Sequence, residues 1–403
     1  MSELSYLEKL LDGVEVEWLP LGKLGELVRG NGLPKSDFTE SGVPAIHYGQ
    51  IYTFYGLSTE TTKSFVSHET AKKLKKVNSG DVVITNTSEN FTDVGKALVY
   101  LGKEQAVTGG HATIFKPNST IIGKYFAYFT QTDSFANEKR KYSKGTKVID
   151  VSASDMAKII IPIPCPENPK KSLAIQSEIV RILDKFTALT AELTAELTMR
   201  KKQYNYYRDQ LLSFKEGEVE GKRKTLGEIM KMRAGQHISA HNIIERKEES
   251  YIYPCFGGNG IRGYVKEKSH DGEHLLIGRQ GALCGNVQRM KGQFYATEHA
   301  VVVSVMPGIN IDWAFHMLTA MNLNQYASKS AQPGLAVGKL QELKLFVPSI
   351  ERQIYIAAIL DKFDTLTNSI TEGLPREIEL RQKQYEYYRD LLFSFPKPET
   401  VSN

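Results

Sequence analysis

The chain has 403 residues, of which 41% are hydrophobic and 10% aromatic, enough for packed cores in two or three domains. A net charge of only +5 permits nucleic-acid binding without demanding it. The sequence has no signal-peptide profile, no apolar run long enough to span a bilayer and no Cys-x-x-Cys pair. We therefore expect a cytoplasmic protein without disulfides, structural zinc or membrane contact.

The first elements are a helical piece over residues 1–13 and a globular unit over 14–168. The apolar runs of this unit predict three strands, the last stopped by prolines, and one helix. The strands are expected at 81–84, 112–115 and 159–164, and the helix at 123–135. The N-terminal helical piece is similar to the run that begins at Asp209, as expected of a permuted duplication whose chain ends meet.

A long amphipathic helix is predicted over residues 169–216. Its apolar residues recur at steps of three or four, which places one seam along the helix that needs a partner helix to bury it. We interpret this helix as a spacer and not as an active site. The tandem Thr-Ala-Glu-Leu repeat at 190–197 adds about 6 Å of helix per unit at ~1.5 Å per residue, so we interpret it as a ruler.

Residues 217–348 repeat the layout of the first unit, residues 349–396 repeat its helix, and 397–403 form a tail. In the second unit strands are expected at 275–278, 300–303 and 345–348, and a helix at 313–321. The helical copies match closely: Ile-Leu-Asp-Lys-Phe occurs at 182–186 and 359–363, and Tyr-x-Tyr-Tyr-Arg-Asp at 204–209 and 385–390. The second helix is expected to kink or break near Gly373 and Pro375. Divergent globular units on nearly identical helices indicate one architecture that presents two specificities.

Sequence motifs for catalysis are missing. Neither a Gly-x-x-x-x-Gly-Lys-Ser/Thr phosphate loop nor an Asn/Asp-Pro-Pro-aromatic methyltransferase motif occurs. Gly258, Gly260 and Gly263 match Gly-x-Gly-x-x-Gly, but strands are predicted on both sides, so we interpret the motif as a turn and not as a dinucleotide site. His111 and His299 occupy equivalent places in the two units; a structural role is the first interpretation, DNA contact the second, and metal binding is not expected.

The paired helical motifs, the tandem repeat, the two units closing on Ile-Pro or Val-Pro and the permuted ends resemble the specificity subunit of type I restriction–modification enzymes, in particular its IC group. The resemblance implies an α/β (α+β) fold: two mixed α/β target recognition domains separated by two long antiparallel coiled-coil helices, with an internal pseudo-two-fold repeat. Each domain is then expected to read one half of a bipartite, asymmetric double-stranded DNA target.

The resemblance also implies partners. The helices would set the spacer between the half-sites and dock two methylation subunits, and two restriction subunits would complete the assembly. The chain itself would be required for methylation and restriction without being catalytic. It would bind no cofactor, because S-adenosylmethionine, ATP and magnesium are expected in the partner subunits.

Candidate DNA contacts follow from the chemistry of recognition. Lysine and arginine neutralise phosphates, whereas base reading needs side chains with paired donors and acceptors. We expect phosphate contacts from the cluster Lys139, Arg140, Lys141 and Lys144, with a solvated charged loop as the alternative. We expect base contacts from polar residues in loops beside strands: Tyr48, Gln50, Asn86 and Ser88 in the first unit, and Asn259, Arg262, Arg279 and Gln280 in the second. Each can equally brace a loop, and Arg279 with Gln280 is the preferred pair.

Candidate partner contacts lie near the ends of the helical copies. They are Tyr206, Tyr207 and Arg208 in the first copy and Tyr387, Tyr388 and Arg389 in the second. Near-identity between the copies is expected where two copies of one partner bind, and core packing is the alternative for each residue. Two other function classes stay open: an enzyme with an unrecognised motif, and a coiled-coil adaptor with protein-binding heads.

Overall fold

The computed structural model describes residues 6–11, 13–214, 219–281, 283–328 and 333–396. The chain forms two compact units, one of residues 1–192 with 379–403 and one of residues 193–378. Each unit therefore combines one globular part with portions of both long helical segments, whereas the domains expected from the sequence separate the globular parts from the helices. We call the globular parts head 1 (residues 14–168) and head 2 (the described residues of 219–348).

Head 1 contains two five-stranded sheets and two short strand pairs. The first sheet has the order β2 (Gly25–Arg29), β12 (Ala112–Pro117), β8 (Val82–Thr85), β10 (Ala97–Tyr100), β5 (Ser58–Thr59). The second has the order β3 (Phe38–Thr39), β6 (Ser64–Val66), β4 (Val43–Ile46), β11 (Ala106–Thr108), β7 (Lys75–Val77). The pairs are β1 (Val16–Pro20) with β14 (Ile160–Pro164), and β9 (Thr87–Ser88) with β13 (Ile149–Asp150). The helices are α2 (Leu21–Leu24), α3 (Tyr48–Thr53), α4 (His68–Lys73), α5 (Gly123–Phe129), α6 (Asp133–Tyr142) and α7 (Ala153–Met156), with the 3₁₀ turn η1 (Lys35–Asp37).

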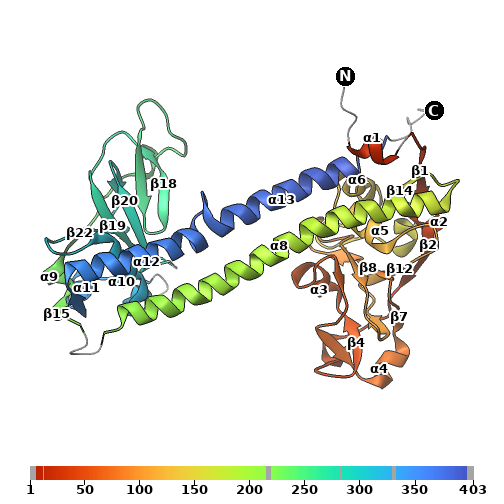
Figure 1. Ribbon diagram of the computed structural model, residues 1–403, viewed down its shortest axis with the longest axis horizontal. Coiled ribbons are helices and arrows are strands. Elements are labelled where there is room, and N and C mark those ends of the chain that lie inside the picture. The colour runs from red at the N-terminus through yellow and green to blue at the C-terminus, as the bar shows by residue number, and fades with distance from the viewer. Residues whose placement is uncertain (1–5, 12, 215–218, 282, 329–332, 397–403) are drawn as a thin grey trace. The chain divides into compact units, whose positions relative to one another are not determined.

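The core of head 1 is layered. Helix α5 lies between the first sheet and the long helix α8 (Pro169–Leu212), and buries Tyr125, Phe126 and Phe129 in one cluster with residues of both (Figure 1). The other face of that sheet packs against the second sheet. The single helix expected at 123–135 is two helices, because Thr132 caps α6 by accepting a hydrogen bond from the backbone N–H of Phe135 at 3.2 Å.

Head 2 repeats this plan with a smaller second sheet. Its first sheet has the order β16 (Met230–Ala234), β22 (Ala300–Val305), β19 (Glu273–Gly278), β20 (Val287–Lys291), which is the order of β2, β12, β8 and β10 in head 1. A three-stranded sheet follows as β18 (Gly260–Val265), β17 (Tyr253–Gly257), β21 (Tyr295–Ala296), and β15 (Gly221–Thr225) pairs with β23 (Lys344–Pro348). The helices are α9 (Leu226–Ile229), α10 (Ile311–Ala320) and α11 (Val337–Gln341), with the 3₁₀ turns η2 (Ala240–Asn242) and η3 (Leu323–Tyr326). The internal repeat predicted from the sequence is thus confirmed at the level of strand order.

Each head is fixed to its helix by the same buried glutamine. In unit 1, Gln176 of α8 accepts a hydrogen bond from the backbone N–H of Ile122, just before α5, at 2.9 Å. In unit 2, Gln353 of α12 (Ile350–Asn368) accepts one from the backbone N–H of Asn310, the N-cap of α10, at 2.8 Å. Both glutamines are almost fully buried, so each amide satisfies backbone groups that would otherwise be buried without a partner.

The expected spacer helix over 349–396 is two helices, α12 and α13 (Gly373–Leu392). Gly373 adopts φ +78°, and a Cβ there would come within 2.4 Å of the Thr365 carbonyl oxygen, so this break requires glycine. The first spacer helix, α8, ends at Leu212 in place of residue 216. The helical copies contact each other within each unit, through Phe186 on Tyr388 in one and Tyr207 on Phe363 in the other.

The two chain ends pack together in unit 1, as the permuted repeat predicts. The indole N–H of Trp18 donates a hydrogen bond to the carbonyl oxygen of Pro396 at 2.8 Å. Phe393 and Phe395 lie in the same core cluster as Trp18, against Leu10 of helix α1 (Tyr6–Leu11). Residues 1–5, 12, 215–218 and 397–403, which include parts of the expected terminal segments, lie outside the described residues.

Candidate nucleic-acid interface

Arg279 and Gln280 follow strand β19 of head 2 directly. The backbone N–H of Arg279 donates to the His299 carbonyl oxygen at 2.8 Å, which holds the segment against the start of β22. The Arg279 side chain is half-buried, and its Nε donates only a long bond of 3.4 Å to the Leu335 carbonyl oxygen. Gln280 is exposed, and its Oε1 lies 2.6 Å from Nδ1 of His299. Backbone contacts therefore fix this strand end while most of the guanidinium and amide donors remain available.

The glycine-rich motif of head 2 is the turn between β17 and β18, as predicted. Gly258 packs so closely on the strand end that a Cβ there would lie 3.0 Å from the carbonyl oxygens of Gln280 and His299. The exposed Asn259 forms the tip of this hairpin. Arg262 is exposed, and its aliphatic stem covers Gly257, where a Cβ would meet Arg262 Cδ at 2.6 Å. The turn thus brings the predicted contacts Asn259 and Arg262 to the same region as Arg279 and Gln280.

Two further residues of this region were not predicted from the sequence. His237 Nδ1 lies 3.1 Å from Oε1 of Glu298, and the same carboxylate oxygen lies 3.5 Å from Nε2 of His299. Burial opposes ionisation of Glu298, but hydrogen bonds from its own backbone and from His237 outweigh burial and lower its pKa. In the sequence, the position of Glu298 directly before His299 was the only indication that this carboxylate belongs to the region.

The equivalent strand end of head 1 differs in what it exposes. Asn86 follows β8, and its backbone N–H donates to the His111 carbonyl oxygen at 2.9 Å. The Asn86 side chain is 0% exposed and its amide atoms have no hydrogen-bond partner among the described residues. The Asn86 side chain is therefore not exposed to a base in this structure. Thr87 and Ser88, in the short strand β9, are half-exposed, and Thr87 Oγ1 lies 2.9 Å from His111 Nδ1.

Tyr48 and Gln50 lie on the short helix α3 and not in a loop. His47 caps this helix, its ring Nδ1 accepting a hydrogen bond from the Gly49 backbone N–H at 3.1 Å. The Tyr48 ring contacts the His111 ring, with centroids 4.9 Å apart, so Tyr48 adjoins the strand end. Gln50 points elsewhere, because its Nε2 donates to Ser64 Oγ at 2.6 Å. The structure therefore groups Tyr48 with His111 and Thr87 but assigns Gln50 a bracing contact.

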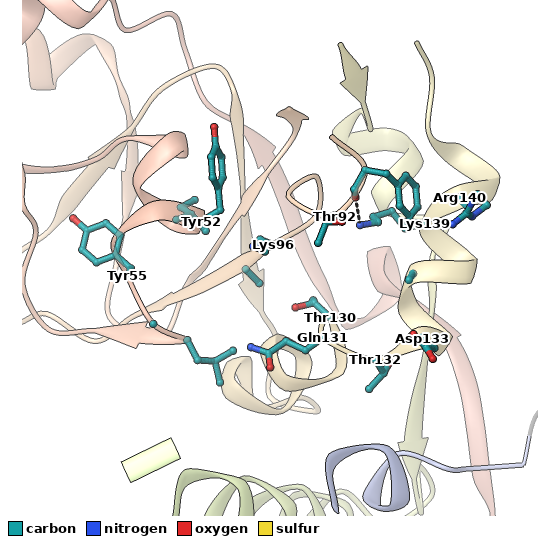
Figure 2. A pocket seen from close by; sticks show the side chains of 16 residues that line it. Tyr52, Tyr55, Thr92, Lys96, Thr130, Gln131, Thr132, Asp133, Lys139 and Arg140 are labelled. Atoms are coloured by element: carbon teal, nitrogen blue, oxygen red, sulfur yellow. Dashed lines mark hydrogen bonds between the residues drawn. The ribbon is translucent and has the colours of Figure 1, made fainter. Parts of the chain in front are cut away.

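The expected basic cluster does not form one surface. Lys139 is 5% exposed, and its ammonium group donates to the carbonyl oxygens of Phe91, at 2.9 Å, and of Val94. Burial, followed by the charges of Lys96 and Arg140, lowers the Lys139 pKa to about 8. The Lys139 side chain extends from helix α6 to brace the 91–94 loop, so its ammonium group is not presented to a phosphate in this structure. Figure 2 shows Lys139 at the wall of a hollow in head 1, with a hydrogen bond of its ammonium group dashed.

The other members of the cluster have separate surroundings. Lys141 pairs with Glu138 at 2.7 Å and Lys144 pairs with Asp155 at 2.8 Å, so both cations are already partly neutralised. Arg140 is exposed, lies 4.6 Å from the Phe91 ring centroid, and makes no ion pair among the described residues. It lines the hollow of about 560 Å³ together with Lys96, Tyr52 and Thr132 (Figure 2). Arg140 is the member of the cluster that the structure leaves available for a phosphate.

The helix-end tyrosines divide into exposed and packed positions in the same way in both copies. Tyr206 and Tyr387 are 61% and 64% exposed. Tyr207 and Tyr388 stack on Phe363 and Phe186, with centroids 5.6 and 5.2 Å apart. Arg208 and Arg389 each pair with the aspartate that follows, at 2.9 and 2.8 Å, and are largely covered. Tyr207 and Tyr388 still remain 42% and 37% exposed, so Tyr206 and Tyr387 are the most exposed of these four tyrosines.

A family model described as the type I restriction modification DNA specificity domain matches residues 13–199 and again residues 218–380. This chain belongs to the type I restriction enzyme specificity subunits. It is 65% identical over 389 residues to the type I restriction enzyme EcoprrI specificity subunit of Escherichia coli, covering 92% of this chain and 93% of that one. It is 44% identical to the EcoR124I/EcoR124II specificity subunit of Escherichia coli, covering 100% of both chains.

Solved structures show the same fold at low identity. The type I restriction–modification S subunit from M. genitalium aligns over 96% of this specificity subunit and 98% of that chain, with a TM-score of 0.59 at 15% identity. A chain from a structure of the assembly and conformational transition of the type I system aligns over 94% and 97%, with a TM-score of 0.55 at 16% identity. The fold of two mixed α/β heads with long helices is therefore that of a type I specificity subunit.

Two negative findings apply to the described residues alone. They contain no helix with the length and hydropathy of a membrane span. Nor do they group three or more histidine, cysteine or carboxylate side chains in an arrangement suited to a metal ion.

Proposed function

We propose that each head of this specificity subunit reads one half of a bipartite, asymmetric double-stranded DNA target. The observation that carries the proposal is the pair of equivalent strand ends after β8 and β19. Each is held by the same backbone hydrogen bond, at 2.9 Å in head 1 and 2.8 Å in head 2, and each is surrounded by exposed polar or aromatic side chains. Rigid backbone with available donors and acceptors is what base reading requires.

Head 2 supplies the larger set of candidate base contacts. Arg279 presents a guanidinium suited to the two acceptors of guanine in the major groove, and Gln280, whose Oε1 bonds His299, presents its amide NH₂ group as a donor. Asn259 and Arg262 extend the same surface on the β17–β18 hairpin. In head 1 the corresponding surface consists of Tyr48 and Ser88.

We further propose that the two helical copies dock two methylation subunits through Tyr206 and Tyr387. These tyrosines are equivalent in the repeat and similarly exposed, as two copies of one partner would require. The neighbouring tyrosines and arginines would hold these two side chains in place; they are Tyr207, Arg208, Tyr388 and Arg389. The chain would contribute no catalytic group and bind no cofactor; S-adenosylmethionine, ATP and magnesium would belong to the methylation subunits and to two restriction subunits.

Methylome mapping tests this proposal. Cells that express the chain with its methylation subunit should carry one methylated motif made of two short sequences separated by a fixed gap. A single uninterrupted motif, or the same methylation without this chain, would contradict the two-head reading. The purified chain incubated with DNA and S-adenosylmethionine should transfer no methyl group, and DNA binding by the complex should weaken with salt, which a protein-binding adaptor would not show.

A further inference from the structure

One histidine occupies the same hydrogen-bonded position in both heads. The His111 carbonyl oxygen accepts from the residue after β8, and the His299 carbonyl oxygen accepts from the residue after β19. The carbonyl oxygen of the residue after each histidine accepts a hydrogen bond from the glycine just after the first edge strand: Ala112 from Gly30 N–H at 2.9 Å, and Ala300 from Gly235 N–H at 2.9 Å. The two histidines therefore share one register in two sheets of the same strand order.

The Nδ1 atom of each imidazole also contacts a side chain at the same position after the strand. Thr87 Oγ1 lies 2.9 Å from His111 Nδ1, and Gln280 Oε1 lies 2.6 Å from His299 Nδ1. Both partners are the second residue after the strand. Because Nδ1 is occupied in each head, Nε2 is the ring atom that can reach a further partner; in head 2 it also lies 3.5 Å from Oε1 of Glu298.

The surroundings of these rings match the candidate DNA surface. His111 is exposed, and its ring contacts Tyr48 at 4.9 Å. The His299 side chain is 38% exposed. Its carbonyl oxygen lies against Gly258, next to the exposed hairpin tip. Neither ring is a buried core group, so packing alone does not account for a histidine at this register in both heads, where the preceding residue differs (Gly110 and Glu298).

We infer that His111 and His299 are matched base-reading residues, one for each half-site, and that Thr87 and Gln280 are the positioning residues that orient them. The inference rests on the proposed function and assigns its contacts. An imidazole can donate to or accept from a base edge in the major groove through Nε2. Gln280 Oε1 can only accept, so Nδ1 of His299 donates to it, and Nε2 is the ring atom on the side of the Glu298 carboxylate. The Thr87 hydroxyl can donate or accept, so Nε2 can be a donor in one head and an acceptor in the other.

The test uses the complex of the full chain with its methylation subunit. Binding is measured on three duplexes: the full target, the target with half-site 1 replaced, and the target with half-site 2 replaced. His111→Ala should lower discrimination at half-site 1 by roughly tenfold and leave half-site 2 unchanged, and His299→Ala should do the reverse. His111→Asn and His299→Asn, which keep a polar side chain, serve as folding-tolerant second variants, and His68→Ala, in the exposed first residue of α4, is the matched control.

The positioning role has its own readout. Thr87→Val should lower discrimination at half-site 1 in part, and Thr87→Ser should restore it; Gln280→Leu should do the same at half-site 2, with Gln280→Glu restoring it. Wild-type discrimination in both histidine variants, or an equal loss on all three duplexes, overturns the inference. If the wild-type complex itself binds the three duplexes equally, the proposed function fails and not merely the assignment of the histidines.

Discussion

The imidazole Nε2 of His316 lies 2.8 Å from a carboxylate oxygen of Asp361 in unit 2, with the histidine 0% exposed. Asp361 is the repeat counterpart of Asp184 in unit 1, which accepts a hydrogen bond from the hydroxyl of Tyr128 at 2.7 Å. Both heads therefore attach to their helix through the same aspartate of the Ile-Leu-Asp-Lys-Phe motif. A histidine donor serves one head and a tyrosine donor serves the other.

This difference predicts that unit 2 loses stability in mild acid. Burial lowers the pKa of His316 below its ordinary value of 6.5, although the bond to Asp361 opposes the shift; Arg289, Asp361 and Asp364 are the charged groups that face the ring. The unfolded chain binds more protons than the folded chain between the lowered pKa and 6.5, so the free energy of unfolding falls as pH falls through that window. The slope is at most about 1.4 kcal/mol per pH unit. Thermal unfolding of the full chain between pH 8 and pH 5.5 measures it.

The control for this prediction is His316→Tyr, which gives unit 2 the hydroxyl donor that Tyr128 supplies in unit 1. The variant should flatten the dependence of unfolding on pH in that range. A slope that is the same in the variant and the wild type would assign the acid sensitivity to other groups.

Arg279→Ala should relax discrimination at one guanine of the second half-site. The guanidinium makes only one long hydrogen bond within the described protein, at 3.4 Å, and a bidentate arginine–guanine contact contributes about 1–3 kcal/mol of discrimination. Competition binding with single-base substitutions in half-site 2 measures the loss. Equal weakening on every sequence would identify Arg279 as a phosphate contact instead.

Replacing Tyr206 and Tyr387 with alanine should impair recruitment of the methylation subunit and leave the fold intact. The two side chains are largely exposed, so removing them creates no cavity. The matched controls are Tyr204→Ala and Tyr385→Ala, because Tyr204 is buried and Tyr385 packs on the core; these should lower stability by about 3 kcal/mol. Co-purification and melting temperature separate the two outcomes. Unchanged assembly of the Tyr206/Tyr387 variant would exclude these residues as docking contacts.

One added Thr-Ala-Glu-Leu unit should change the preferred gap between half-sites without altering either half-site. No side chain from Thr190 to Leu197 is buried, so an insertion there disturbs no core while lengthening the helix by about 6 Å. Methylome mapping of the insertion variant gives both half-sites and the gap. A changed half-site with an unchanged gap would contradict the ruler interpretation.

The repeat, the glycine turn and the break at Gly373 could be predicted from the sequence. Each depends on the spacing of apolar residues or on the positions of glycine and proline, which are visible within a short stretch of chain. The sequence did not predict which polar residues fold inward. Asn86 and Lys139 both stand in polar stretches, yet Asn86 lies within the core and Lys139 reaches carbonyl groups more than 40 residues away in the chain. His237 and Glu298 were missed for the same reason, since the strand pairing that brings them together joins distant parts of head 2.

The hydrogen bond from Trp18 to Pro396 has a consequence for synthesis. Unit 2 is built from one uninterrupted stretch of chain, whereas unit 1 combines residues that precede unit 2 with residues that follow it. Head 1 leaves the ribosome before unit 2, but its hydrophobic cluster lacks Leu392, Phe393 and Phe395 until the residues of unit 2 have been made. Head 1 is therefore made before unit 2 but completes its core after it. A nascent chain truncated before Leu392 lacks these core residues and cannot complete the hydrophobic cluster of head 1.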